Sequence, residues 1–281
     1  MEKPGFLEIV KDLLLPPICS ICGRESLSPI CESCKSKIRE IDTDICDYCG
    51  RPLSADSYNA DCYEVKSTNQ PVDSQHPADS FEKVKSCVHV LKGDQGEGIN
   101  RQEFFGREAK GCSFCRGENF SFFKLRSYSL YKGEMKSIIK KFKYQKIHAL
   151  GGVLAKFLIE AYNKYYRNEK IDFIDTVPDF LGEACLNHMQ ILCIEMSKKL
   201  GLPFINNIIK IRKTSKQQGL DWSQRKKNLE GAFKVKNCLL VKNRNLLLVD
   251  DVWTTGSTLN EISKVLKNSK ANKIYLLTIA R

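Results

Sequence analysis

The segment from Leu246 to Thr258 constrains the fold of this 281-residue chain more than any other. Four apolar residues are followed by two acids, Asp250 and Asp251, and then by a short turn rich in hydroxyl groups. This order predicts a strand buried on both faces, which carries the acids to the edge where open α/β sheets bind ligands. A plain strand end and helix cap is the weaker interpretation, because a cap needs only one such residue.

The turn itself predicts a phosphate-binding loop. Backbone N–H groups and hydroxyls can bind phosphate oxygens, a glycine lets the main chain approach closely, and the following helix adds its positive end. The expected phosphate-binding residues are Thr254, Thr255, Gly256, Ser257 and Thr258.

Apolar periodicity predicts alternating strands and helices after residue 122. The expected strands are 127–131, 171–177, 245–249 and 274–279, with a possible strand at 204–209, and the expected helices are 135–142, 152–166, 184–200 and 258–266. Such alternation indicates an α/β fold, with a mostly parallel sheet flanked by helices.

Cysteines dominate the first part of the chain. Of 13 cysteines, eight form four Cys-x-x-Cys pairs, a spacing that turns two sulfurs inward and lets two pairs complete a tetrahedral zinc site. We expect a first zinc at Cys19, Cys22, Cys31 and Cys34, and a second at Cys46, Cys49, Cys112 and Cys115. Buried free thiols are the alternative, but residues 1–51 hold little apolar material to bury them.

These patterns divide the chain into four parts. Residues 1–51 form a Cys-rich zinc-binding module, and residues 52–111 read as a polar insertion, largely loop or disordered. Residues 112–121 bring the last cysteine pair back to the zinc module, and residues 122–281 form the α/β domain.

The net charge of +12 suggests attraction to polyanions without identifying one. Aromatic residues that could stack on bases, Phe142, Tyr144 and Trp222, lie among the basic clusters, which favours a nucleic-acid strand. Solvated helix faces remain the alternative. The nucleic-acid candidates are Lys136, Lys140, Lys141, Lys143, Lys226 and Lys227.

The Leu246–Thr258 segment resembles the phosphoribosyl pyrophosphate (PRPP) signature of type I phosphoribosyltransferases. A second segment is similar to one that precedes this strand in the ComF family of competence proteins; it reads Thr214-x-x-Gln217-x-x-Leu220, Arg225-x-x-Asn228 and Gly231-Ala-Phe233. A third, Leu130-Tyr131-Lys132-Gly133, resembles the start of that family's transferase domain.

The resemblance implies a type I phosphoribosyltransferase fold for residues 122–281, joined to a small N-terminal zinc-ribbon module. It also implies that Asp250 and Asp251 hold the ribose hydroxyls or their magnesium, and that Thr254 to Thr258 cradle the 5′-phosphate. Gln217, Arg225 and Asn228 would belong to a mobile flap. The implied partners are PRPP or a related nucleotide, single-stranded DNA and a DNA-uptake helicase.

One segment departs from the family pattern. Where ComF proteins carry a basic stretch on the pyrophosphate side, this chain has no arginine and adds Glu183, and like charges repel strongly in such a site. We therefore expect weaker PRPP binding and poor turnover. His148 and His188 have no partner visible in the sequence, so a structural role is the simpler interpretation for both.

Two function classes remain. The favoured one is a DNA-uptake protein that handles single-stranded DNA and uses its PRPP-binding domain as a nucleotide sensor. The alternative is a magnesium-dependent phosphoribosyltransferase with an unknown acceptor. Because the sequence has neither a membrane-length apolar stretch nor a signal-peptide pattern, we expect a cytoplasmic protein without a membrane span.

Overall fold

The computed structural model describes residues 17–42, 44–53, 110–112, 115, 120–145, 147–179, 187–214 and 222–281. Most of the predicted insertion, 52–111, lies outside these residues. The α/β domain is built around a sheet whose strands are β1 (Lys124–Ser129), β2 (Phe173–Thr176), β5 (Leu246–Val252) and β6 (Ile274–Ala280).

Within the described residues the strands of this sheet run parallel, in the order β1-β6-β5-β2. β5 and β6 occupy the middle, and Asp250 on β5 lies opposite Thr278 on β6. Central parallel strands are buried on both faces and read as continuous apolar runs, which is why the segment before Asp250 consists of leucine and valine.

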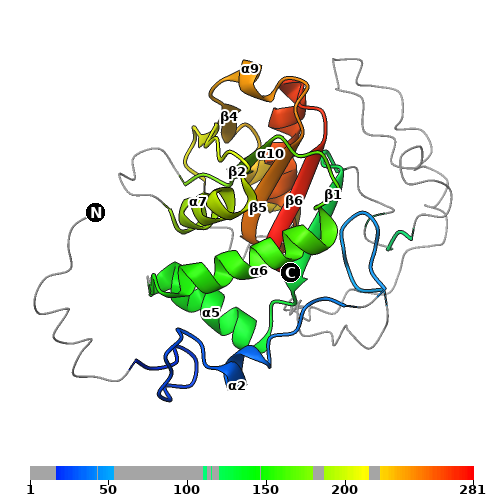
Figure 1. Ribbon diagram of the computed structural model, residues 1–281. Coiled ribbons are helices and arrows are strands. Elements are labelled where there is room, and N and C mark those ends of the chain that lie inside the picture. The colour runs from blue at the N-terminus through cyan, green and yellow to red at the C-terminus, as the bar shows by residue number, and fades with distance from the viewer. Residues whose placement is uncertain are drawn as a thin grey trace, which may run out of the picture.

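One face of the sheet is covered by α5 (Gly133–Tyr144), α6 (Leu150–Tyr165) and α7 (His188–Leu200), as Figure 1 shows. Alternate strand residues, among them Leu247 and Val249, point into this layer and join its core. The helices present the 3.6-residue apolar stripe expected from the sequence: in α5 the buried residues are Met135, Ile138, Ile139 and Phe142.

α10 (Ser257–Asn268) packs on the opposite face, against the strand residues that point the other way, such as Leu246 and Leu248. Helices therefore cover both faces of a parallel sheet. The predicted fold class is confirmed, and the ends of the predicted elements shift by only a few residues, as in β5, which continues to Val252 through both acids.

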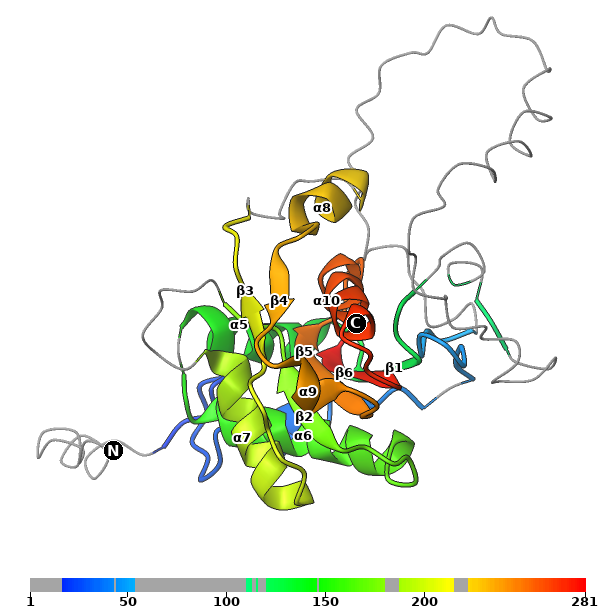
Figure 2. The ribbon, with the colours of Figure 1, turned by 90° about the horizontal axis from the view of Figure 1, so that it is seen from above.

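A small antiparallel sheet, which the sequence analysis missed in part, stands beside the main one. It pairs β3 (Ile208–Lys210) with β4 (Phe233–Val235), and α8 (Trp222–Leu229) lies between them in the chain. Figure 2 shows α8 projecting beyond the two strands. A buried carboxylate ties this unit to the main sheet, because the Asn207 backbone N–H donates to Asp175 Oδ2 on β2 at 2.9 Å.

The cysteine-rich region lies along the edge of the domain. Its short helix α2 (Glu32–Lys35) carries Cys34 and follows Cys31, its N-cap residue. The chain that follows runs antiparallel to the end of β1, with Glu40 opposite Ser129. The Ile41 N–H donates to the Tyr128 carbonyl at 2.8 Å. This pairing covers the free edge of β1 and fixes the module to the sheet. α9 (Cys238–Val241) lies just before β5.

Candidate functional site

The acid pair lies at the carboxyl end of β5, where the sequence predicted it. Asp251 is buried and Asp250 is half-buried. After the acids the chain turns through Trp253 and enters α10 at Ser257, so the first turn of α10 opens beside the carboxylates.

Gly256 gives the loop its shape. Its φ of +75° lies in the left-handed region, and a Cβ there would come within 2.0 Å of the Trp253 ring. The indole is buried against Phe120 and Phe122, with ring centroids 5.9 and 5.6 Å away. Only glycine readily adopts this backbone angle and also leaves room for the tryptophan ring.

The hydroxyl-bearing residues surround the start of α10. Thr254 is exposed, and Thr254 and Thr258 line the cleft described below. Thr255 Oγ1 and Ser257 Oγ are hydrogen-bonded at 3.1 Å. The N-cap residue is Gly256, so no side chain of that residue caps the helix, and helix N-termini favour anions.

Asp251 is bound by the side chains of Lys143 and His188, which sequence reasoning did not connect with it. Lys143 Nζ lies 2.7 Å from its Oδ2, and His188 Nε2 lies 3.0 Å from the same oxygen. Burial alone would raise the pKa of Asp251, but the hydrogen bond from His188 and the charge of Lys143 outweigh it and lower the pKa below its usual range. Asp251 is therefore ionised at neutral pH.

Asp250 behaves in the opposite way. Its Oδ1 accepts from the Asp251 backbone N–H at 2.9 Å. Burial and the adjacent Asp251 charge raise the pKa of Asp250 to about 8. Two neighbouring carboxyls with divergent pKa values can hold a ligand through one charged and one protonated group.

A cleft of about 450 Å³ opens above this edge of the sheet. It is walled by the acid pair, by the end of β2 with Asp179, by the last turns of α5, and by the base of the small sheet. Its charged lining consists of Asp179, Asp250, Asp251, Lys140, Lys143 and Lys210. The cleft therefore mixes acids suited to ribose hydroxyls with lysines suited to phosphate.

The remaining site predictions fall in several places. Gln217 lies outside the described residues, as do the side chains of Arg225 and Lys226. The Asn228 carbonyl accepts from Arg212 at 3.0 Å. Of the basic candidates, Lys136, Lys140 and Lys227 are exposed, whereas Lys141 donates to the Ser20 carbonyl of the first cysteine cluster.

The first cysteine cluster brings together Cys19, Cys22, Cys31 and Cys34, whose sulfurs lie within 4.8 Å of one another. Cys22 Sγ and Cys31 Sγ are 3.7 Å apart, close to the roughly 3.8 Å edge of a tetrahedron with 2.3 Å zinc–sulfur bonds. Arg24 Nε donates to Cys22 Sγ at 3.4 Å and lowers the pKa of that thiol to about 6. The donor set fits zinc.

The second cluster consists of Cys46, Cys49, Cys112 and Cys115 and is wholly buried. Cys49 Sγ and Cys112 Sγ are again 3.7 Å apart, although 63 residues separate them in the chain. Two arginines of the α/β domain reach it. Arg126 Nη1 donates to the Asp47 carbonyl at 3.0 Å, and Arg281 donates to the Cys49 carbonyl and lies 3.8 Å from Cys49 Sγ.

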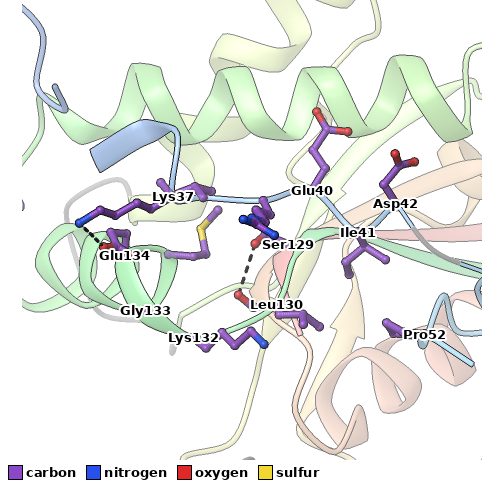
Figure 3. Close-up of a pocket in the computed structure, with 13 residues that line it drawn as sticks. Lys37, Glu40, Ile41, Asp42, Pro52, Ser129, Leu130, Lys132, Gly133 and Glu134 are labelled. Atoms are coloured by element: carbon purple, nitrogen blue, oxygen red, sulfur yellow. Dashed lines mark hydrogen bonds and ion pairs between the residues drawn. The ribbon is translucent and has the colours of Figure 1, made fainter. Parts of the chain in front are cut away.

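A larger pocket, about 560 Å³, lies between the cysteine-rich region and the start of α5 (Figure 3). Lys37 points toward Glu134 across it, with a 3.6 Å ion pair, while Glu40 and Asp42 line its far side. The pocket contains none of the predicted ligand-binding residues. The smaller cleft at the acid pair is the one that matches the sequence prediction.

Comparison with known proteins agrees with this picture. Residues 10–63 match the family model "Double zinc ribbon domain", and residues 144–281 match "Phosphoribosyl transferase domain". The first model ends before Cys112 and Cys115, the two residues that complete the second cluster. Fold and site thus define a phosphoribosyltransferase-domain protein with an N-terminal double zinc ribbon.

Three relatives, each matched over most of its own length, identify the family within this class. Competence protein F of Haemophilus influenzae is 32% identical, over 62% of this chain and 79% of that protein. DNA utilization protein YhgH of Salmonella typhi is 26% identical, over 63% and 80%. Competence protein ComFC of Streptococcus pneumoniae is 24% identical, over 72% and 84%. The chain belongs to the ComF family of competence proteins. Among its described helices, none has the length and apolarity to cross a bilayer.

Proposed function

We propose that this protein handles single-stranded DNA during DNA uptake and binds PRPP or a related nucleotide in its transferase domain. The main observation behind the proposal is that one cleft brings together an acid pair, several lysines and the start of α10, whose N-cap residue is a glycine. The relatives' names, competence proteins and DNA utilization proteins, supply the DNA context.

The site residues suggest how such a ligand lies. The 5′-phosphate binds the first turn of α10, where Thr254 to Thr258 offer N–H groups and hydroxyls. The ribose hydroxyls face Asp250 and Asp251. The flap role of Gln217, Arg225 and Asn228 rests on the family resemblance, and Gln217 lies outside the described residues. Magnesium, when bound with PRPP, neutralises its pyrophosphate charge, and Asp250 and Asp251 are the residues placed to hold it.

The lysines extend the site toward a longer polyanion. Lys140 and Lys143 line the cleft from α5, and Lys210 lines it from β3. Lys136 and Lys227 are exposed on α5 and α8, two helices that contribute lining residues to the cleft. A strand that follows these side chains would keep one phosphate group in the cleft and its neighbours outside it.

Titration with a single-stranded oligonucleotide at several salt concentrations tests the DNA part. Affinity should fall steeply with salt, because each neutralised phosphate contributes about −0.7 to the log-log slope. Reversing Lys136, Lys140 and Lys227 to Glu should flatten that slope by about two units and weaken binding of every sequence alike.

Reversal of Lys156, Lys199 and Lys242 serves as the matched control. These lysines are also exposed but line neither the cleft nor its mouth. Their reversal should change the slope by less than about half a unit. Equal losses in both triple variants would show a general charge effect and contradict a defined strand path.

The alternative, a magnesium-dependent phosphoribosyltransferase, rests on the intact acid pair and phosphate loop. It predicts release of pyrophosphate from PRPP when the correct acceptor is present. Absence of release with a broad panel of nucleobases, despite measurable PRPP binding, would favour the sensor role.

We further propose that both cysteine clusters bind structural zinc, one ion each. The sulfur spacing and the four-thiolate donor sets support this, and thiolates persist only in a reducing compartment, so we place the protein in the cytoplasm. The domain limits follow: a zinc module that includes Cys112 and Cys115, the 52–111 insertion, and a transferase domain from residue 122.

A further inference from the structure

The contacts of Asp251 are unusual for a residue meant to bind a ligand. Lys143 comes from the last turn of α5, and His188 is the first residue of α7, so three separate elements meet at one carboxylate. Both side chains contact Oδ2, at 2.7 and 3.0 Å, and the Asp251 side chain is 8% exposed. Burial makes these contacts worth more than a surface ion pair.

Both residues lie on elements that other contacts hold in place. Asn187 and Gln190 form a capping box at the start of α7, and Asn187 Nδ2 donates to the Val177 carbonyl at 3.3 Å. The His188 ring stands edge-on to Phe142, with centroids 5.9 Å apart. Phe142 is buried in the core and directly precedes Lys143. The core and the cap therefore fix the backbone positions of both residues.

We infer that Lys143 and His188 are positioning residues of the phosphoribosyl site, which hold Oδ2 of Asp251 and so present its other oxygen to the ribose hydroxyls. This inference rests on the proposed function. The charge of Lys143 also offsets the negative charge of Asp251, which would otherwise repel a phosphorylated ligand beside Asp179 and Asp250. Lys143 thus belongs with the acid pair, and His188 is a site residue rather than a structural one.

The test is calorimetry of PRPP with magnesium against single variants. Lys143→Met and His188→Ala should each weaken affinity about tenfold, the consequence of losing one charge-assisted hydrogen bond. Lys143→Arg and His188→Gln keep a donor within reach and should recover most of the loss. Lys198→Met is the matched control: it removes a lysine from an exposed 2.8 Å ion pair with Glu195 and should bind like wild type.

A second arm asks whether the two residues act through Asp251. In an Asp251→Asn background, Lys143→Met should weaken binding by less than about twofold, because the charge that it positions is already gone. A tenfold loss that persists in this background would overturn the inference, since Lys143 would then act on the ligand or on folding. Thermal melting of each variant shows whether the loss comes from an effect on folding.

The outcomes also separate this inference from the proposed function. If wild-type protein binds PRPP and the Met, Ala, Arg and Gln variants bind equally well, only the positioning role fails. If wild-type protein shows no binding, the proposed function fails and the positioning role with it. If Lys143→Met or His188→Ala does not fold, the Lys143→Arg and His188→Gln variants take their place in the test. Wild-type-like affinity in these variants supports the inference. Loss of binding in a folded Arg or Gln variant contradicts it.

Discussion

At the scale of single residues, the loop proposed to bind phosphate depends on one contact, that of Gly256 with Trp253. The tryptophan fills the space that a side chain at position 256 would need, and two phenylalanines hold the indole there. The loop is therefore shaped by its apolar contacts as much as by its hydroxyls.

Replacement of Gly256 by Ala tests this pairing. Gly201→Ala is the control, because Gly201 has a similar φ of +68° and open space around its Cβ position. The control should be destabilised only by the backbone strain of an alanine in the left-handed region, about 1–2 kcal/mol. Gly256→Ala must also displace the buried indole, so its free energy of unfolding in urea should fall further and PRPP binding should be lost.

Equal destabilisation by the two substitutions, with PRPP binding kept, would contradict this account of the loop. The strain at position 256 would then be relieved by movement of Trp253 without consequence for the ligand.

At the scale of elements, the structure separates what sequence could predict from what it could not. The strand, acids and loop of 246–258 are contiguous, so their local chemistry predicts them directly. The cysteine pairs are also recognisable, because each knuckle is local and only the pairing of Cys49 with Cys112 is distant.

The partners of Asp251 could not be predicted in the same way. His188 and Lys143 lie 63 and 108 residues from it, and only the packing of α5 and α7 on the sheet brings them together. Helical periodicity placed Lys143 beside a buried stripe, but it could not show that the adjoining surface is the wall of the cleft.

The arginines beside the cysteine clusters give a prediction at this scale. Arg281 lies against Cys49 of the second cluster, and Arg24 donates to Cys22 of the first. Outer partners of metal ligands commonly contribute 10–100-fold to affinity. Arg281→Met should therefore speed zinc loss from the second cluster alone, and Arg24→Met from the first alone.

Timed alkylation of cysteines, followed by peptide mass analysis, assigns the loss to a cluster. Cys49 and Cys112 should become reactive about tenfold sooner in Arg281→Met, with Cys31 and Cys34 unchanged, and the reverse should hold for Arg24→Met. Alkylation of both clusters at the same rate in either variant would show that the arginines have no specific role.

At the scale of the whole molecule, the two cysteine clusters pack against opposite sides of the transferase domain. Cys19 and Cys34 pack with the core formed by α5, α6 and α7, while Cys46, Cys49 and the other ligands of the second cluster pack with the α10 side. The zinc module is therefore continuous with both hydrophobic cores. The cleft lies at the carboxyl edge of the sheet, between these two layers.

The second cluster also reaches the ligand edge through the backbone. Arg281, which contacts Cys49, follows Ala280, and the Ala280 carbonyl accepts from the Trp253 N–H at 2.9 Å. The second cysteine cluster, the end of β6 and the loop at Trp253 thus form one connected structure.

Calorimetry of PRPP and magnesium binding to wild-type protein and to the Asp250→Asn, Asp251→Asn double variant tests the proposed ligand site most directly. The account predicts one PRPP per wild-type chain, and loss of binding in a double variant that stays folded and keeps its zinc content, because the two acids hold the ligand. A double variant that binds PRPP as well as wild type but melts at a much lower temperature would show that the acids only cap the strand and the helix, and would contradict the account.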